Sequence, residues 1–199
     1  MPALSAKDLP DRIRLPFRFE PAALRHELSV IEARGWTGHF VVDNYDGQWG
    51  AIALRAPVME THPIRMIFSN PGTKAYADQP ALADAPYLRQ VLRTLSCHLL
   101  SVRLMRLGPG SVIKPHRDPD LDPEDGTVRL HIPILTCPKV EFLLAGRAVV
   151  MAPGECWYLR LSEVHSVYNR GSESRVHLVI DAELNDWLLE ILSCAATSA

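Results

Sequence analysis

Hydrophobic and polar residues alternate with a period of two through much of the second half of the chain. From Leu99 onward, short stretches of this kind are separated by turn residues such as Gly108-Pro109-Gly110. Side chains at i and i+2 share a face of an extended strand, so the pattern predicts strands with one buried face. We expect strands at residues 99–107, 111–117, 127–136, 140–144, 147–151, 155–161, 165–169 and 174–183. Short strands at this spacing favour a β-sandwich or a jelly roll.

The first third of the chain has a less regular pattern. Residues 1–20 are rich in proline and arginine, which predicts a segment that wraps over the surface. Pro21 begins a stretch whose apolar residues recur at helical spacing to about Ala33, so we expect a helix there. Further helices are expected at about 87–95 and 184–194.

Two connections in this region carry turn-forming residues. Asp46-Gly47 stands between apolar runs at 39–42 and 49–54, a pattern that predicts a β-hairpin. Residues 57–85 contain several prolines and little periodicity, which predicts a long ordered loop. No repeat or linker interrupts the chain, so we expect a single domain over residues 1–199.

The composition is that of an ordinary globular protein. Of the 199 residues, 47% are hydrophobic and 22% are charged, and the formal net charge is −2. This balance offers no basic surface for nucleic acid, and the apolar runs are too short for a membrane span. Because no apolar leader opens the chain, we expect a cytoplasmic location. There is no C-x-x-C pair, which predicts reduced thiols at Cys97, Cys137, Cys156 and Cys194.

Candidate chemistry begins at the tripeptide His116-Arg117-Asp118. On a strand, His116 and Asp118 share a face and can bind one ion from the same side. If the fold brings His165 alongside them, two imidazoles and a carboxylate meet, which is the ligand set of non-haem Fe(II) oxygenases. Arg117 would then point away from the metal. The spacing H-x-D is common by chance, so the surrounding strands have to support it.

Two of the predicted strands carry an Arg-x-His pair on one face. Arg129 and His131 alternate with apolar residues in one strand, as do Arg175 and His177 in another. The apolar faces must meet the core, so the Arg-x-His faces are directed to solvent or to a polar cavity. A guanidinium beside a metal is suited to binding a carboxylate through two hydrogen bonds. A dicarboxylate such as 2-oxoglutarate could therefore chelate the metal at one end and meet an arginine at the other.

At these residues the chain resembles the aspartyl/asparaginyl β-hydroxylase family of Fe(II)/2-oxoglutarate oxygenases. The resemblance runs from about Leu104 to Trp187 and is carried by Leu107-Gly108-Pro109-Gly110, His116, Val128-Arg129-Leu130-His131-Ile132-Pro133, Gly154-Glu155, His165-Ser166-Val167 and Arg175-Val176-His177-Leu178-Val179. It implies a mainly β, cupin-like jelly roll, the double-stranded β-helix, flanked by helices from the N-terminal third and a C-terminal helix. It also implies Fe(II), 2-oxoglutarate and O2 as the means of hydroxylating an unactivated C–H bond.

The resemblance assigns roles to individual residues. It implies that the catalytic iron is bound by His116, Asp118 and His165. The far carboxylate of 2-oxoglutarate is expected at Arg175, and further contacts with this co-substrate are expected at Arg129 and His131. His177 receives no role beyond supporting its neighbours.

The resemblance also divides the chain by task. Residues 99–183 are expected to form the jelly-roll core with the metal site, and residues 184–199 the C-terminal helix and tail. Residues 1–98 match the family less clearly and are expected to shape the substrate side. We expect a small amino acid or peptide-like substrate, with neither nucleic acid nor a membrane as partner.

Two other classes of function fit part of this pattern. A cupin-type metal enzyme that does not use 2-oxoglutarate needs the same ligands but no inward arginine. A non-catalytic jelly-roll binding module needs no complete triad. Jelly rolls host all three classes, so the fold alone does not choose among them.

Several other polar and aromatic residues are interpreted as structural. Histidines without a partner at ligand spacing are assigned to the surface or the core: His26, His39, His62 and His98. Packing in the core or a hairpin is expected for Trp49, Trp157 and Tyr158. Arg103 and Arg106 lie on opposite faces of one strand, so at most one of them points inward.

Overall fold

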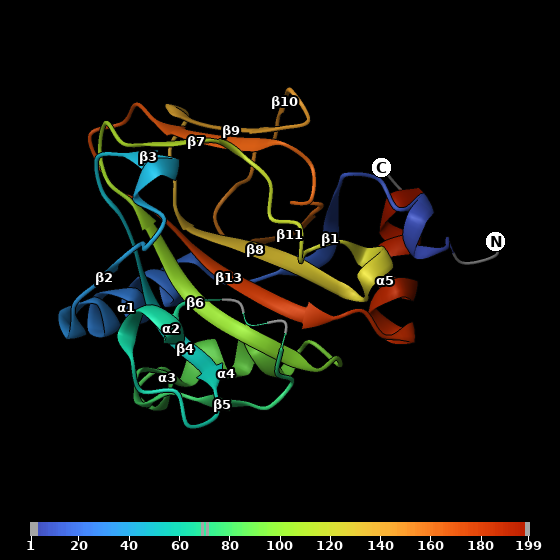
Figure 1. The fold of residues 1–199 in the computed structure, drawn as a ribbon, viewed down its shortest axis with the longest axis horizontal. Coiled ribbons are helices and arrows are strands. Elements are labelled where there is room, and N and C mark those ends of the chain that lie inside the picture. The colour runs from blue at the N-terminus through green and yellow to red at the C-terminus, as the bar shows by residue number, and fades with distance from the viewer. Residues whose placement is uncertain (1–3, 69, 71, 198–199) are drawn as a thin grey trace.

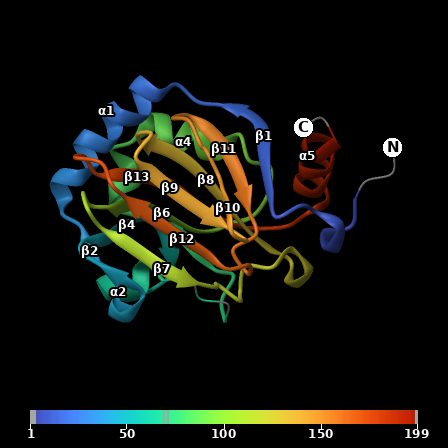
Figure 2. The ribbon, with the colours of Figure 1, turned by 90° about the horizontal axis from the view of Figure 1, so that it is seen from above.

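Two antiparallel β-sheets face each other at the centre of the protein (Figure 1). The structure is a computed structural model that describes residues 4–68, 70 and 72–197. Figure 2 shows the smaller sheet, with β7, β9 and β12, lying over the larger one. Most of the helices lie on the opposite side of the larger sheet, and α5 lies at one end, near both termini. The arrangement confirms the predicted mainly β jelly roll with flanking helices.

The larger sheet has eight strands within the described residues, in the order β1-β11-β8-β13-β6-β4-β2 with β5 paired to β4. The strands are β1 (Arg12–Arg18), β2 (Thr37–Gly38), β4 (Trp49–Pro57), β5 (Tyr76–Asp78), β6 (Leu99–Leu107), β8 (Thr127–Leu135), β11 (Glu155–Leu159) and β13 (Arg175–Glu183). The two Arg-x-His strands, β8 and β13, are neighbours, and Asp181 is paired with Arg129 in their register.

In the part of the chain that the structure describes, the smaller sheet has five strands in the order β10-β9-β12-β7-β3. They are β3 (Tyr45–Asp46), β7 (Val112–His116), β9 (Val140–Leu144), β10 (Arg147–Ala148) and β12 (His165–Asn169). The central strand, β12, pairs with β7 on one side and with β9 on the other. Both predicted histidine ligands therefore lie on adjacent strands of one sheet.

Helices and the outer face of the larger sheet enclose the main core. The α-helices are α1 (Pro21–Ile31), α2 (Pro63–Met66), α3 (Pro80–Ala83), α4 (Pro86–Arg93) and α5 (Asp186–Thr197), and the 3-10 turns are η1 (Ala6–Asp8), η2 (Glu32–Arg34), η3 (Val42–Asn44) and η4 (Pro123–Asp125). Leu24 and Leu28 of α1 are buried in the same cluster as Leu130 and Ile132 of β8. Full burial of each such side chain contributes about 1.5–3 kcal/mol. Within the described chain, no helix combines the length and apolar character needed to cross a membrane.

The space between the sheets holds a smaller apolar cluster and a polar region. Trp49 and Leu107 of the larger sheet belong to one cluster with Ile113, Phe142 and Val167 of the smaller sheet. The alternate residues of β8 and β13 face this space rather than solvent, and most of them are buried, among them Arg129, His131, Arg175 and His177. The Arg-x-His faces therefore line an internal site, which was one of the two possibilities open from the sequence.

The expected surface wrap over residues 1–20 is wrong in part, because residues Arg12–Arg18 form the edge strand β1. This strand pairs with β11 through Ile13 and Tyr158. Ile13 and Leu15 are buried on its inner face, while Arg14 between them is exposed. The period of two was present locally but was masked by the proline and arginine content.

The predicted tight turn at Asp46-Gly47 is wrong, although the chain does reverse here, since Thr37–Gly38 of β2 pairs antiparallel with Gly50–Ala51 of β4. β3 pairs with β7 of the smaller sheet, whereas β4 pairs with β6 of the larger sheet. Asp46-Gly47 is therefore a crossover between sheets, and Gly47 adopts a positive φ of 88° that favours glycine at this turn.

The expected long loop at residues 57–85 contains α2, β5 and α3. Prolines begin α2 and α3 at their first helical positions, where a missing N–H group costs no hydrogen bond. Residues 69 and 71 of this segment lie outside the described residues. The predicted strand at 147–151 is shorter than expected and covers only Arg147–Ala148.

Candidate active site and metal centre

His116 and His165 are brought together by the pairing of β7 with β12. The two residues are partners in the strand register, and their ring centroids lie 4.2 Å apart. Asp118 follows β7 by two residues, and its backbone N–H donates to the carbonyl oxygen of Leu161 at 2.8 Å. One ligand atom from each of the three side chains lies within 4.8 Å of the others.

Both imidazoles are oriented by the backbone. His116 Nδ1 lies 2.8 Å from the carbonyl oxygen of Lys114, and His165 Nδ1 lies 3.0 Å from that of Glu163. A carbonyl oxygen only accepts, so each Nδ1 carries a proton, and in the neutral ring the lone pair is then on Nε2. Burial, together with the neighbouring His116, lowers the pKa of His165 to about 4, so that ring is neutral near pH 7. A neutral imidazole fixed through its other nitrogen is the usual form of a metal ligand.

The three side chains fit one divalent ion. His116 Nε2 lies 3.8 Å from Asp118 Oδ1. Bonds of about 2.1 Å to a shared ion separate the ligand atoms by roughly 3–4 Å, so the triad needs to close only slightly. Two imidazoles and one carboxylate on one side of an ion match Fe(II) with open positions opposite. The sequence-predicted triad is thus assembled by the fold.

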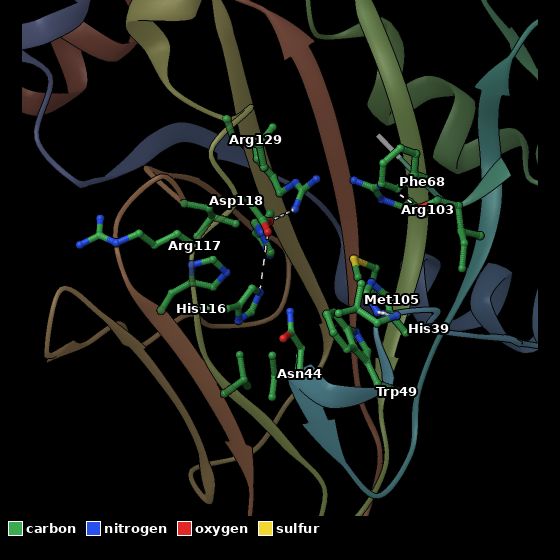
Figure 3. A pocket seen from close by; sticks show the side chains of 18 of the residues that line it. His39, Asn44, Trp49, Phe68, Arg103, Met105, His116, Arg117, Asp118 and Arg129 are labelled. Carbon is green, nitrogen blue, oxygen red and sulfur yellow. Dashed lines mark hydrogen bonds and ion pairs between the residues drawn. The ribbon is translucent and has the colours of Figure 1, made fainter. Parts of the chain in front are cut away.

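A cavity of about 300 Å³ opens beside this triad (Figure 3). Its walls come from both sheets and from the segments before β4 and after α2. Charged residues such as Arg129 line it near the triad, where the ring of Trp49 also lies 6.3 Å from that of His116, and apolar side chains that include Phe68 and Met105 line it further away. Such a volume suits a small molecule, with polar groups at one end to orient it.

Arg129 is already paired with two carboxylates. Its Nη1 donates to Asp118 Oδ2 at 2.7 Å, and its Nε and Nη2 donate to Asp181 at 2.5 and 3.0 Å. Asp181 is fully buried and also accepts from Arg103 Nη2 at 2.6 Å. Sequence reasoning missed Asp181, although it continues the inward face of β13 by period two from His177. This position, an acid between apolar residues, was the signal available.

Arg175 differs from the other inward arginines because no described carboxylate is bonded to it. It is 3% exposed, and its Nη2 donates to His177 Nδ1 at 2.8 Å. Its guanidinium also lies 5.9 Å from the ring centroid of Phe142. Burial lowers the pKa of Arg175 to about 9, and no described anion offsets that effect. A buried cation without a counter-ion at a cavity wall is suited to binding an anion.

His131 and His177 are neutral partners of this arginine. Burial, and then the charge of Arg175, lowers the pKa of each well below the ordinary value. Their Nδ1 atoms lie 3.3 Å apart, and because Arg175 donates to His177 Nδ1, the proton of that contact belongs to His131. Among the described residues, His131 Nε2 has no hydrogen-bond partner.

The structure also places residues that the sequence had assigned to packing. His39 lines the cavity and stacks on Trp49, with ring centroids 3.5 Å apart, so both residues form part of the cavity wall. His39 follows β2, in the apolar run that was expected to form one side of a hairpin, and that pattern gave no signal for a position at the cavity. Trp157 and Tyr158 do pack away from the cavity: Trp157 donates to Glu155, and Tyr158 is buried in the main core.

Two further expectations about arginines are met. Arg103 faces the cavity, whereas Arg106 lies over the ring of Trp36 at 4.6 Å on the opposite face of β6. Arg117 points away from the triad in Figure 3, donating to the carbonyl of Ser162 and to Glu163.

Comparison with solved structures supports the fold. An oxidoreductase of the 2OG-Fe(II) oxygenase family from Burkholderia pseudomallei superposes with a TM-score of 0.55, covering 88% of this chain and 86% of that one. The sequence identity is 15%, so this likeness concerns the fold alone.

Two curated relatives are more similar in sequence. An L-proline cis-4-hydroxylase from Rhizobium meliloti (strain 1021) is 27% identical over 172 residues, which is 83% of this chain and 58% of the relative. L-proline cis-3-hydroxylase 2 from a Streptomyces species is 32% identical over 114 residues, which is 54% of this chain and 39% of the relative. The matches thus span less than two thirds of either relative.

A family model settles the relationship. The model described as Aspartyl/Asparaginyl beta-hydroxylase matches residues 23–184, a range that contains the triad, the Arg-x-His strands and Asp181. The chain therefore belongs to the aspartyl/asparaginyl β-hydroxylase family.

Proposed function

We propose that the protein is an Fe(II)/2-oxoglutarate-dependent hydroxylase acting on an unactivated C–H bond of a small amino acid. One observation carries the proposal: a His-Asp-His triad and a buried arginine without a carboxylate partner, among the described residues, line the same cavity. A triad alone is compatible with several kinds of metal enzyme. The additional unpaired cation favours an anionic co-substrate.

Iron is assigned to His116, Asp118 and His165. When bound there, Fe(II) together with O2 and 2-oxoglutarate would supply the oxidising chemistry for C–H hydroxylation. The protein's part is to hold three ligands on one side of the ion, so that the other side stays open to co-substrate and O2. The Nδ1 contacts with backbone carbonyls support this role because they direct both Nε2 lone pairs toward one point.

2-Oxoglutarate is assigned to the wall formed by Arg175, His131 and Phe142. Its far carboxylate would pair with the Arg175 guanidinium, and its other end would face the triad across the cavity. His177 supports this assignment, since it accepts from Nη2 and limits the orientations of the guanidinium. His131 remains a proposed neighbour of the co-substrate. For Arg129, whose Nε and both Nη atoms already donate to carboxylates, we propose a supporting role at Asp118 instead.

The substrate is proposed to be a free amino acid of about the size of proline. The two relatives above are named as L-proline hydroxylases, and the cavity of about 300 Å³ is suited to a molecule of that size beside the co-substrate. Trp49, Phe68 and Met105 offer an apolar surface for an aliphatic body. Arg103 and Asn44 also line the cavity and offer polar contacts for a carboxylate and an ammonium group.

The two competing classes of function lack such support. A metal enzyme that does not use 2-oxoglutarate has no need for a buried arginine without a counter-ion at the cavity wall. A non-catalytic module has no need for two imidazoles whose lone pairs are held toward a carboxylate.

Turnover with a panel of substrates tests the proposal. The protein would be incubated with Fe(II), ascorbate, 2-oxoglutarate and O2, and succinate would be measured by NMR. We expect L-proline or a close analogue to stimulate succinate formation and to gain one hydroxyl group by mass spectrometry. Stimulation by a folded protein but by no free amino acid would contradict the substrate class. Absence of 2-oxoglutarate binding would contradict the proposal as a whole.

A further inference from the structure

Asp181 lies at the centre of a buried ionic network that joins both sides of the cavity. Its side chain is fully buried and accepts hydrogen bonds from Arg103 and Arg129. Arg129 continues to Asp118, and Arg103 continues to the carbonyl oxygen of Ile67. Asp181 itself lines neither the cavity nor the triad.

The first arm of the network ends at the proposed metal ligand. Asp181 binds Arg129 through both carboxylate oxygens, which fixes the plane of the guanidinium. In that orientation Nη1 points at Asp118 Oδ2, at 2.7 Å, and leaves Oδ1 on the side of His116. Asp118 lies beyond the end of β7, so strand pairing does not fix its side chain as it fixes the two histidines. The Asp181–Arg129 pair takes over that task.

The second arm ends at the cavity wall formed by Ile67 and Phe68. Arg103 Nη1 donates to the Ile67 carbonyl at 2.7 Å, immediately after α2. The next residue, Phe68, packs edge-on against Phe40 with ring centroids 5.2 Å apart, and both rings line the cavity. Arg103 thus links the segment that carries Phe68 to the larger sheet, and Asp181 fixes Arg103 in turn.

Asp181 is the anion that makes this arrangement possible. Without Asp181, the nearby carboxylate left to balance the charges of these two buried arginines would be that of Asp118, which is needed at the metal. Burial alone would raise the pKa of Asp181, but the charges of Arg103 and Arg129 hold it below its ordinary value. The carboxylate is therefore ionised, and each of its two cations extends to a different functional wall.

We propose that Asp181 is a positioning residue for the active site, acting on the metal-binding carboxylate through Arg129 and on the Ile67–Phe68 segment through Arg103. The proposal rests on the function proposed above only in taking Asp118 as a metal ligand. It adds a residue that touches neither metal nor substrate and links the two sides of the site.

Three variants separate the arms. Asp181→Asn keeps the size of the side chain but turns an NH2 group toward the arginines, so both arms are disturbed. Arg129→Lys keeps the charge but cannot bridge Asp181 and Asp118, so only the metal arm is disturbed. Arg103→Met leaves the Arg129–Asp181 pair intact and removes the bond to Ile67.

Asp78→Asn is the matched control, since it removes an ion pair with Arg55 that is partly exposed and far from the triad.

Two measurements on metal-free protein read the arms separately. Titration with Co(II), followed by its visible absorption, measures the affinity of the triad. Loss of a residue that orients a metal ligand typically weakens binding about 10- to 100-fold, which we expect for Asp181→Asn and Arg129→Lys but not for Arg103→Met. Hydrogen–deuterium exchange at residues 60–68 should rise in Asp181→Asn and Arg103→Met but not in Arg129→Lys. The control should match the wild type in both measurements.

The outcomes distinguish this inference from the proposed function. An Asp181→Asn protein that binds Co(II) like the wild type, even with a lower melting temperature, would limit Asp181 to a structural role and overturn the inference. If that variant does not fold, Arg129→Lys and Arg103→Met test the inference instead. Equal Co(II) affinities and equal exchange at residues 60–68 in these two variants would overturn the inference. A wild-type protein without affinity for Co(II) would instead remove the proposed metal centre, and this inference with it.

Discussion

His116 and His165 are partners in the register of β7 and β12, and each Nδ1 is bonded to the carbonyl of the residue two positions earlier. Strand pairing therefore fixes two of the three proposed ligands by the same local geometry. The third, Asp118, lies past the strand and depends on the Leu161 carbonyl and on Arg129. The centre thus combines a rigid pair of imidazoles with a carboxylate held by a longer chain of contacts.

Asp118→Asn is expected to weaken metal binding. The amide retains the shape of the carboxylate but loses its charge and its ion pair with Arg129. We expect at least about 10-fold weaker Co(II) binding, by analogy with disturbed metal sites, and a corresponding loss of 2-oxoglutarate turnover. Asp120→Asn is the matched control, because Asp120 lines the same cavity but is not part of the triad. Equal losses in both variants would argue against a specific role for Asp118.

Arg175→Met is expected to weaken 2-oxoglutarate binding. A charge-assisted hydrogen-bonded pair contributes about 1.5–3 kcal/mol, which corresponds to about 10- to 150-fold in the dissociation constant. Isothermal titration of the Co(II)-loaded protein measures this directly, while the metal affinity should stay near the wild-type value. Arg170→Met is the control, since Arg170 is exposed and pairs with Glu141. An unchanged affinity for 2-oxoglutarate in Arg175→Met would exclude this residue as the site of the far carboxylate.

The strands and the residues of the candidate site were largely predictable because their signals are local. The pattern of β8 and β13 defines which residues share a face, and the H-x-D spacing requires only one strand. What local pattern cannot supply is the partner of each strand. Asp46-Gly47 has the composition of a hairpin turn, yet β3 and β4 pair with different strands in different sheets.

Asp181 and His39 illustrate the remaining limits. Asp181 had a place on the inward face of β13, but its role depends on Arg103 and Arg129, which reach it from two other strands. His39 lies outside regular structure, and its position follows from stacking on Trp49. Both are long-range relationships between side chains, and a pattern along the chain does not contain them.

Gly154→Ala is expected to destabilise the fold strongly. Gly154 has a φ of 78°, and a Cβ there would collide with the carbonyl oxygen of Phe19, which leads from β1 into α1. Gly126 has the same φ of 78°, but a Cβ there would meet no atom within 4 Å. Gly126→Ala should therefore lower the free energy of unfolding only by the conformational cost of about 1–2 kcal/mol. Gly154→Ala should lower it by clearly more. Urea denaturation compares the two, and equal losses would show that the Phe19 contact relaxes without cost.

The stability of the metal-free protein is expected to fall as the pH drops from about 6.5 to 4. Burial, followed by the charge of Arg103, lowers the pKa of His39 to about 4, and burial lowers that of His165 to about 4. In this window the unfolded chain binds protons at these histidines that the folded protein does not, so protons favour unfolding. The stability contribution of the neutral rings is complete above about pH 6.5 and is lost toward pH 4.

His39→Phe tests the contribution of one of these rings. Phenylalanine keeps the stacking surface against Trp49 but removes one site of proton uptake in the unfolded chain. We expect the difference in unfolding free energy between pH 7 and pH 5 to shrink by on the order of 1 kcal/mol, a value already reduced for the partial exposure of the ring. His98→Phe is the control, because His98 is exposed. Urea denaturation at both pH values gives the comparison, and an unchanged pH dependence in His39→Phe would mean that His39 titrates alike in the folded and unfolded states.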